Sequence, residues 1–201
     1  MVHDAPERAL RLVRICAAPR LYIGDACVTA AEIDQLLARA ADATWRSARG
    51  IALDPEATGS LFTVPAASDE LIARVTRRIH AAAGLAEAPG STLCFRRSVA
   101  GEADPPVDVL EDAGRERIAT GVLCLTGAEE GGAVHFPRAE PVPLALRTRP
   151  GQLLLWFHRL SDGREDPAAV HADMPVRRGS TTTLTACIYR PRAAPAAPSP
   201  G

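Results

Sequence analysis

Lysine and asparagine are both absent from this sequence of 201 residues, so its 23 strongly basic side chains are all arginines. Without lysine, the chain cannot form a lysine Schiff base, anchor pyridoxal phosphate or supply the cation of a P-loop. Any anion that needs a side-chain cation must be bound by arginine or by protonated histidine. The bias is typical of a GC-rich genome, because the codons for lysine and asparagine are rich in A and T.

Three further features of the composition exclude classes of protein. No apolar run approaches the roughly 20 residues that a membrane-spanning helix needs. The net charge of −1 favours neither nucleic acid nor an acidic membrane surface as a partner. The 5 cysteines are scattered and never spaced as Cys-x-x-Cys, which argues against zinc ribbons and disulfide scaffolds. We therefore predict a cytoplasmic protein without a nucleic-acid or membrane partner.

Hydrophobic periodicity predicts helices in the first half of the chain and strands in the second. Thr29-Ala-Ala-Glu32 has the form of a capping box, and apolar residues follow it at helical spacing. A second amphipathic helix is predicted from Ser68-Asp69 to Gly84. Short strands separated by glycine and proline follow, and Thr181–Tyr189 alternates cleanly between two faces. This order predicts an α+β fold with a sandwich or jelly-roll core.

The predicted strands carry a specific set of motifs. They are Arg117-Ile-Ala-Thr120, Gly121-Val-Leu-Cys-Leu125, Glu129-Glu-Gly-Gly132 with Phe136-Pro137, Arg149-Pro-Gly151 with Leu153–Trp156, and His171-x-x-x-Pro175-Val176-x-x-Gly179. In type and order they resemble the prolyl 4-hydroxylase branch of the iron(II)/2-oxoglutarate-dependent dioxygenases. The resemblance implies a double-stranded β-helix (jelly-roll) core with the N-terminal helices packed on one sheet. We assign residues 20–190 to this domain, 1–19 to an N-terminal extension, and 191–201 to a disordered Pro/Ala tail.

The resemblance implies iron(II) and 2-oxoglutarate as cofactors, with the iron bound by a His-x-Asp motif and a distal histidine. His171 matches the distal histidine. With a one-residue deletion, Pro106-Val-Asp108 aligns with His-x-Asp, so that Asp108 keeps the carboxylate and proline replaces the histidine. Without the deletion, Val107 and Val109 fill both positions. On either alignment the family's triad is incomplete.

Two other side chains are candidates for the missing ligand. No histidine occurs between His80 and His135, and His135 reaches the metal position only if strand alternation points it inward. Glu111 supplies a carboxylate only if its loop shifts. A metal site made of His171 and carboxylates is rich in oxygen and favours manganese or magnesium over iron. The sequence leaves these alternatives open.

The co-substrate positions have also changed. In the family branch, a lysine ten residues after the distal histidine binds the far carboxylate of 2-oxoglutarate, and a strand tyrosine assists it. These positions are Thr181 and Cys124 in this chain. Arg190 matches the family's closing Trp-x-Arg pattern, and a guanidinium can bind a carboxylate through two hydrogen bonds. The resemblance thus gives Arg190, Thr181 and Cys124 as candidate cofactor-binding residues.

Three functions compete on this reading. The ancestral reaction is hydroxylation of a peptidyl, amino-acid or natural-product substrate, but the first metal histidine and the 2-oxoglutarate lysine are both missing. The first alternative is a metal-independent biosynthetic enzyme of the cyclase or isomerase type that reuses the barrel pocket. The second is a non-catalytic binding domain. The partner expected in each case is a small molecule or a peptide.

Overall fold

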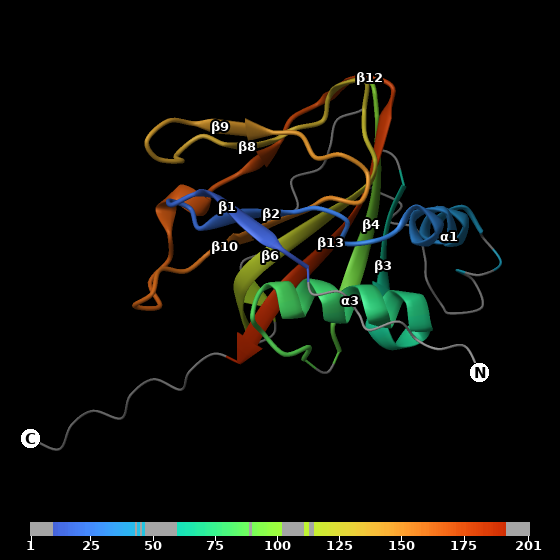
Figure 1. The fold of residues 1–201 in the computed structure, drawn as a ribbon, viewed down its shortest axis with the longest axis horizontal. Helices are drawn as coiled ribbons and strands as arrows, with labels where there is room; N and C mark the ends of the chain where they lie inside the picture. Colours follow the sequence, from blue (N-terminus) through green and yellow to red (C-terminus); the bar gives the residue numbers. More distant parts are fainter. Residues whose placement is uncertain are drawn as a thin grey trace, which may run out of the picture.

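The computed structural model describes residues 10–42, 44, 46, 60–88, 90–101, 111–112 and 115–191. Its main elements are a large antiparallel sheet, two smaller sheets and two amphipathic helices (Figure 1). Asp108, residues 1–9 of the predicted extension and residues 192–201 of the predicted tail lie outside the described residues.

The two helices begin at the capping residues that the sequence predicts. Helix α1 (Ala30–Ala41) starts after Thr29, whose hydroxyl accepts a hydrogen bond from the Glu32 backbone N–H at 3.2 Å, while the Glu32 carboxylate accepts from the Thr29 N–H at 2.9 Å. Helix α3 (Glu70–Ala82) starts after Asp69, which accepts from two N–H groups of the first turn. None of the helices in the described ranges is long and apolar enough to cross a bilayer.

Eight antiparallel strands form the major sheet. In spatial order they are β1 (Leu12–Cys16), β2 (Leu21–Gly24), β10 (Leu153–Phe157), β6 (Arg115–Thr126), β13 (Ser180–Pro191), β4 (Thr92–Val99) and β3 (Ser60–Pro65), and β5 (Glu111–Asp112) also pairs with β6. Strand β1 does not appear among the predicted strands. Val13 and Ile15 on this strand are exposed apolar residues, so the polar alternation that marks a surface strand is missing.

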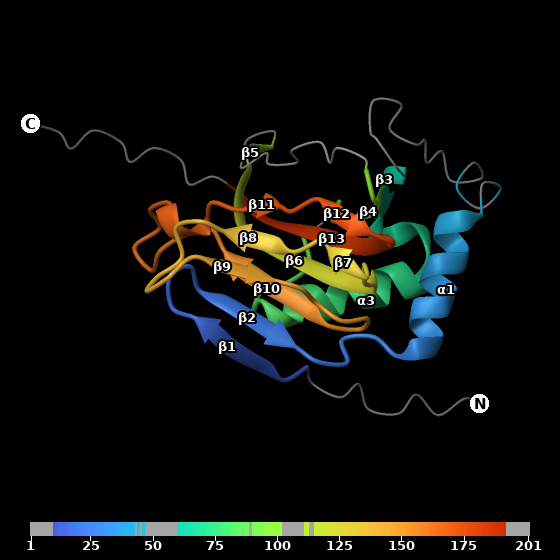
Figure 2. The ribbon, with the colours of Figure 1, turned by 90° about the horizontal axis from the view of Figure 1, so that it is seen from above.

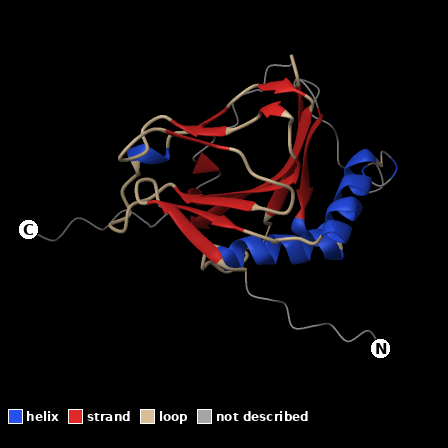
Figure 3. Cartoon of the chain, turned by 45° about the horizontal axis from the view of Figure 1, so that its top comes forward, coloured by secondary structure: helices blue, strands red, loops and turns tan. Residues whose placement is uncertain are grey.

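Two smaller sheets face the major sheet (Figure 2). One is built from β11 (Ala172–Asp173), β8 (Val134–Phe136) and β9 (Leu144–Leu146), and the other from β12 (Val176–Arg178) and β7 (Glu130–Gly131). Figure 3 shows both helices on the outer side of the major sheet, away from these short strands. The predicted jelly-roll core, with the N-terminal helices packed on one sheet, is confirmed.

Strand alternation divides the hydrophobic side chains into two cores. Leu123 on β6 and Leu184 on β13 face the helices, in a helix-side core that also contains Val75 and Ile79 of α3. An inter-sheet core lies on the opposite face of the major sheet. It contains Cys16, Leu21, Phe136, Ala139, Leu154, Trp156 and Ala169. The interior of the barrel is therefore apolar at the end where β10 of the major sheet faces β8 of the smaller sheet.

Helix α3 packs closely against the sheet at Gly121. A Cβ atom at this position would lie 2.6 Å from Cγ2 of Ile79, closer than van der Waals contact permits. The glycine that begins the aliphatic part of β6 is thus a packing requirement of the helix above it. Because the helix holds β6 from outside, the opposite face of the strand is left to line the barrel.

The capping box gives a first prediction. Thr29→Ala removes the hydroxyl that accepts from the Glu32 N–H, and it should lower the free energy of unfolding by about 1 kcal/mol in urea denaturation followed by circular dichroism. Thr29→Ser keeps the hydroxyl and should retain most of that stability. An equal loss in both variants would show that the methyl group of Thr29, and not the cap, is responsible.

Candidate functional site

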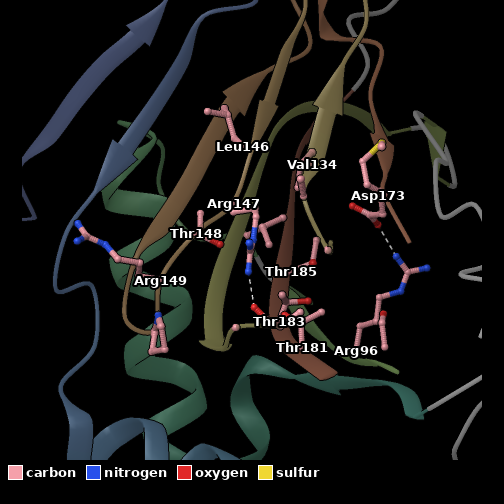
Figure 4. A pocket seen from close by; sticks show the side chains of 18 residues that line it. Arg96, Val134, Leu146, Arg147, Thr148, Arg149, Asp173, Thr181, Thr183 and Thr185 are labelled. Atoms are coloured by element: carbon pink, nitrogen blue, oxygen red, sulfur yellow. Dashed lines mark hydrogen bonds and ion pairs between the residues drawn. The ribbon is translucent and has the colours of Figure 1, made fainter. Parts of the chain in front are cut away.

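A pocket of about 340 Å³ lies between the major sheet and the smaller sheets (Figure 4). Small-molecule sites in proteins typically have volumes of roughly 300 to 1,000 Å³. Its walls come from β4, β6 and β13 on one side and from β8, β9 and β11 on the other. The pocket therefore lies in the interior of the barrel, beside the inter-sheet core.

One wall of the pocket is a row of threonines on β13. Thr181, Thr183 and Thr185 alternate with residues of the helix-side core, so all three lie on the barrel face of the strand. The Thr181 hydroxyl donates to the backbone oxygen of Thr126 at 2.8 Å. Its proton is thus used within the sheet, and Thr181 can offer a ligand only the oxygen lone pairs of its hydroxyl.

Arg96 supplies the positive charge that Thr181 lacks. It lies on β4, the neighbour of β13, and its backbone is paired with that of Thr183, while Thr181 is paired with Ser98. The Arg96 side chain is 12% exposed and lines the pocket, where it forms an ion pair with Asp173 of β11 (Figure 4). The Arg96 cation therefore lies on the strand next to that of Thr181, the residue that the family motif indicates. It is displaced from Thr181 by one inward-facing position.

Two further arginines lie at the rim of the pocket. The Arg147 guanidinium donates to the backbone oxygens of Ala128 and Glu129. Arg149 is mostly exposed, with a guanidinium nitrogen 3.8 Å from the Asp25 carboxylate. With Arg96 and Asp173, the pocket lining carries three arginines and one carboxylate. This excess of positive charge favours an anionic ligand.

His171 lies at the apolar end of the barrel, just before β11. Its ring packs against Trp156 at a centroid distance of 4.7 Å, and its Nδ1 lies 3.0 Å from the backbone oxygen of Ala169. A carbonyl oxygen accepts only from a protonated nitrogen, so Nδ1 carries the hydrogen and Nε2 is the atom able to bind a metal. Asp173 follows two residues later and therefore lies on the same side of the chain as His171.

His158 is a second imidazole beside His171, with ring centroids 5.9 Å apart. It is buried, and its Nε2 lies 2.7 Å from the hydroxyl of Thr120. Burial, together with the positive charges of Arg117, His171 and Arg159, lowers the pKa of His158 to about 3. The ring is therefore neutral near pH 7 and is held by a hydroxyl partner.

Of the other candidate metal ligands, only His135 has a side chain that the structure describes, and it does not join His171. His135 lies between Val134, which lines the pocket, and Phe136, which belongs to the inter-sheet core. Since both neighbours face the barrel interior, the His135 side chain faces away from it. Glu111 lies in β5, which pairs with the first residues of β6, and Asp108 lies outside the described ranges.

The structure places Arg190 apart from the other two candidate co-substrate residues. Thr181 lines the pocket, whereas Cys124 is buried on β6, with its thiol 3.5 Å from the backbone oxygen of Thr148 in the pocket wall. Burial raises the pKa of the Cys124 thiol, so it remains protonated. Arg190 lies at the far end of β13 and forms an ion pair with Glu116, away from the pocket lining.

Comparison with known proteins points to one group. The chain is 26% identical over 156 residues to probable prolyl 4-hydroxylase 11 of Arabidopsis thaliana. This alignment covers 72% of this chain and 56% of that protein. It is 25% identical over 207 residues to probable prolyl 4-hydroxylase 6 of the same plant, covering 89% of this chain and 72% of that protein. The chain thus spans little more than half the length of the first relative. No family model matches it.

Solved structures share the fold. A viral collagen prolyl hydroxylase from Paramecium Bursaria Chlorella virus-1, in complex with 2-oxoglutarate, superposes with a TM-score of 0.63 and 19% identity over 87% of this chain and 98% of that one. A Pseudomonas putida prolyl-4-hydroxylase gives 0.52 and 17% identity over 88% and 95%. The chain is similar in sequence to prolyl 4-hydroxylases. It has the fold of the iron(II)/2-oxoglutarate-dependent dioxygenases, as the motifs predict.

The described residues of the chain do not present the donor set of the family's iron. The stretch between His80 and His135 contains no histidine, so the imidazole of the His-x-Asp motif is missing wherever that stretch lies. Within the described ranges, no three histidine, cysteine, aspartate or glutamate side chains form a cluster able to hold a metal ion. Asp173, the acid nearest to His171 along β11, is paired with Arg96. These residues do not fit a two-histidine, one-carboxylate iron site.

Proposed function

We propose that this chain binds a small organic anion with a carboxylate, such as 2-oxoglutarate, in the pocket between the sheets, and that it does so without the family's iron-dependent turnover. The observation that carries the proposal is the Arg96 guanidinium, which is largely buried in the pocket wall next to the threonines of β13. A guanidinium in this setting offers a carboxylate two parallel hydrogen bonds.

The similar proteins support the class of ligand. The solved viral prolyl hydroxylase is a complex with 2-oxoglutarate, which is itself a dicarboxylate. The same fold also occurs in SnoN, described as a non-heme alpha-ketoglutarate-dependent epimerase of nogalamycin biosynthesis, with a TM-score of 0.55 and 14% identity over 87% of this chain and 77% of that one. The fold therefore serves reactions other than hydroxylation, and the carboxylate pocket is what we expect this chain to share.

Loss of the iron site leaves two roles for a bound anion. It is either the substrate of a metal-independent isomerisation or cyclisation, or a ligand that the domain senses or carries. Neither role requires a step at a metal.

The proposal is tested on the full chain after anaerobic loading with iron(II). We expect well under one iron per chain by elemental analysis and no succinate from 2-oxoglutarate, while calorimetry detects binding of 2-oxoglutarate to the metal-free protein. Stoichiometric iron with coupled succinate formation would establish a working dioxygenase instead. If the metal-free protein binds no 2-oxoglutarate, succinate or glutarate, the proposed anion site is wrong.

A further inference from the structure

The ion pair between Arg96 and Asp173 joins the two layers of the barrel across the pocket. Arg96 belongs to β4 of the major sheet, and Asp173 belongs to β11 of the three-stranded sheet (Figure 4). Both residues line the pocket. A carboxylate of the chain itself thus occupies a position on the guanidinium that an anionic ligand would use.

The two partners differ in how firmly they are held. The Arg96 side chain is 12% exposed, whereas the Asp173 side chain is 45% exposed. Arg96 lies within β4, which is paired with β13 on one side and β3 on the other. Asp173 ends a two-residue strand that is paired with β8 alone among the described strands. Asp173 can therefore return to water at lower cost than Arg96 can leave the pocket wall.

We propose that Asp173 is a built-in competitor for the anion site. In the ligand-free protein its carboxylate holds the Arg96 guanidinium, and a bound carboxylate takes its place and releases Asp173 to solvent. This inference rests on the proposed function, since it concerns the same pocket. Binding is then an exchange of one carboxylate for another on a single guanidinium.

The exchange determines which ligands the pocket accepts. A neutral compound of similar shape cannot replace the charge-assisted hydrogen bonds of Asp173, so it would leave the ion pair closed across the pocket. An anion with the planar geometry of a carboxylate matches the guanidinium as Asp173 does. The pocket should therefore bind 2-oxoglutarate and reject its uncharged dimethyl ester.

Asp173→Asn tests the inference, because it removes the charge and keeps the size of the side chain. We expect it to bind 2-oxoglutarate about 3- to 10-fold more tightly than the wild type in calorimetry at low salt. Asp173→Ser should show the same direction, which guards against a local effect of the amide. In an Arg96→Gln background the Asp173→Asn change should bring no gain, because the shared cation is gone.

Glu130→Gln is the matched control. Glu130 lies on β7, is exposed and is 3.8 Å from the Arg177 guanidinium, so this variant changes the net charge equally outside the pocket. Equal affinities of the wild type and both Asp173 variants, or an equal gain in Glu130→Gln, would overturn the inference while the proposed anion site stands. Absence of binding in the wild type and in every Asp173 variant would instead overturn the proposed function.

Discussion

Arg96→Gln is expected to weaken the binding of 2-oxoglutarate by about 10- to 100-fold, since hydrogen bonds to a charged group contribute roughly 1.5 to 3 kcal/mol. Glutamine keeps a polar side chain, but it is shorter than arginine and lacks the charge and the double-donor geometry of the guanidinium. The Arg96 side chain is largely buried, so solvent screens its charge less than that of the arginines at the rim. Calorimetric titration of the metal-free protein measures the change.

Arg97→Gln provides the control for this prediction. Arg97 is the next residue on β4, so its side chain faces the other side of the sheet, and it does not line the pocket. The variant removes the same charge from the same strand and should bind 2-oxoglutarate as the wild type does. Equal losses in both variants would mean that the overall charge of the chain, and not the Arg96 guanidinium, attracts the ligand.

The positive charge of the pocket is a feature that could not be located from the sequence. Composition excludes lysine, and the family motif points to Thr181, so the sequence suggests that the co-substrate charge has been lost. The register of β13 against β4 brings Arg96 into the same pocket from a residue 85 positions earlier in the chain. A motif aligned along one strand cannot report a substitution made on its neighbour. The alternation along β4 was the available signal, because Leu93 and Phe95 face the helix-side core and Arg96, the next residue, therefore faces the barrel.

The fold itself could be predicted further than the site. The capping box at Thr29, the amphipathic α3 and the alternation of β13 are local patterns, and each appears in the structure where the sequence places it. Strand β1 is not predicted from the sequence, because its stability depends on pairing with β2. The exposed apolar residues Val13 and Ile15 do not indicate that pairing. Long-range pairing, and not propensity, decides such edge strands.

The imidazoles required the sheet register as well. The sequence leaves open whether His135 turns inward, and the inward positions of Val134 and Phe136 show that it does not. His158 directly follows β10, and its ring is hydrogen-bonded to the Thr120 hydroxyl. What the sequence does not reveal is its electrostatic setting, because Arg117 and Arg159 act on the ring through space. The pairing of His158 with His171 is likewise a product of tertiary structure.

The electrostatic surroundings of His158 predict that the free energy of unfolding falls markedly in acid. Burial and nearby positive charges lower the pKa of folded His158 to about 3, whereas in the unfolded chain it titrates near 6.5. Between these values the unfolded state binds more protons than the folded state, so the free energy of unfolding falls as the pH is lowered from 6.5 towards 3. This one side chain should cost about 2 kcal/mol of stability at pH 5, and nothing above pH 7.

His158→Gln separates this contribution from those of other titrating groups. Glutamine stays neutral at every pH and can still form a hydrogen bond with the Thr120 hydroxyl. The drop in unfolding free energy between pH 7.5 and pH 5.0, measured by urea denaturation, should be about 2 kcal/mol smaller in this variant than in the wild type. Parallel stability curves for the wild type and His158→Gln would show that His158 becomes protonated in the folded barrel, and the low pKa would then be wrong.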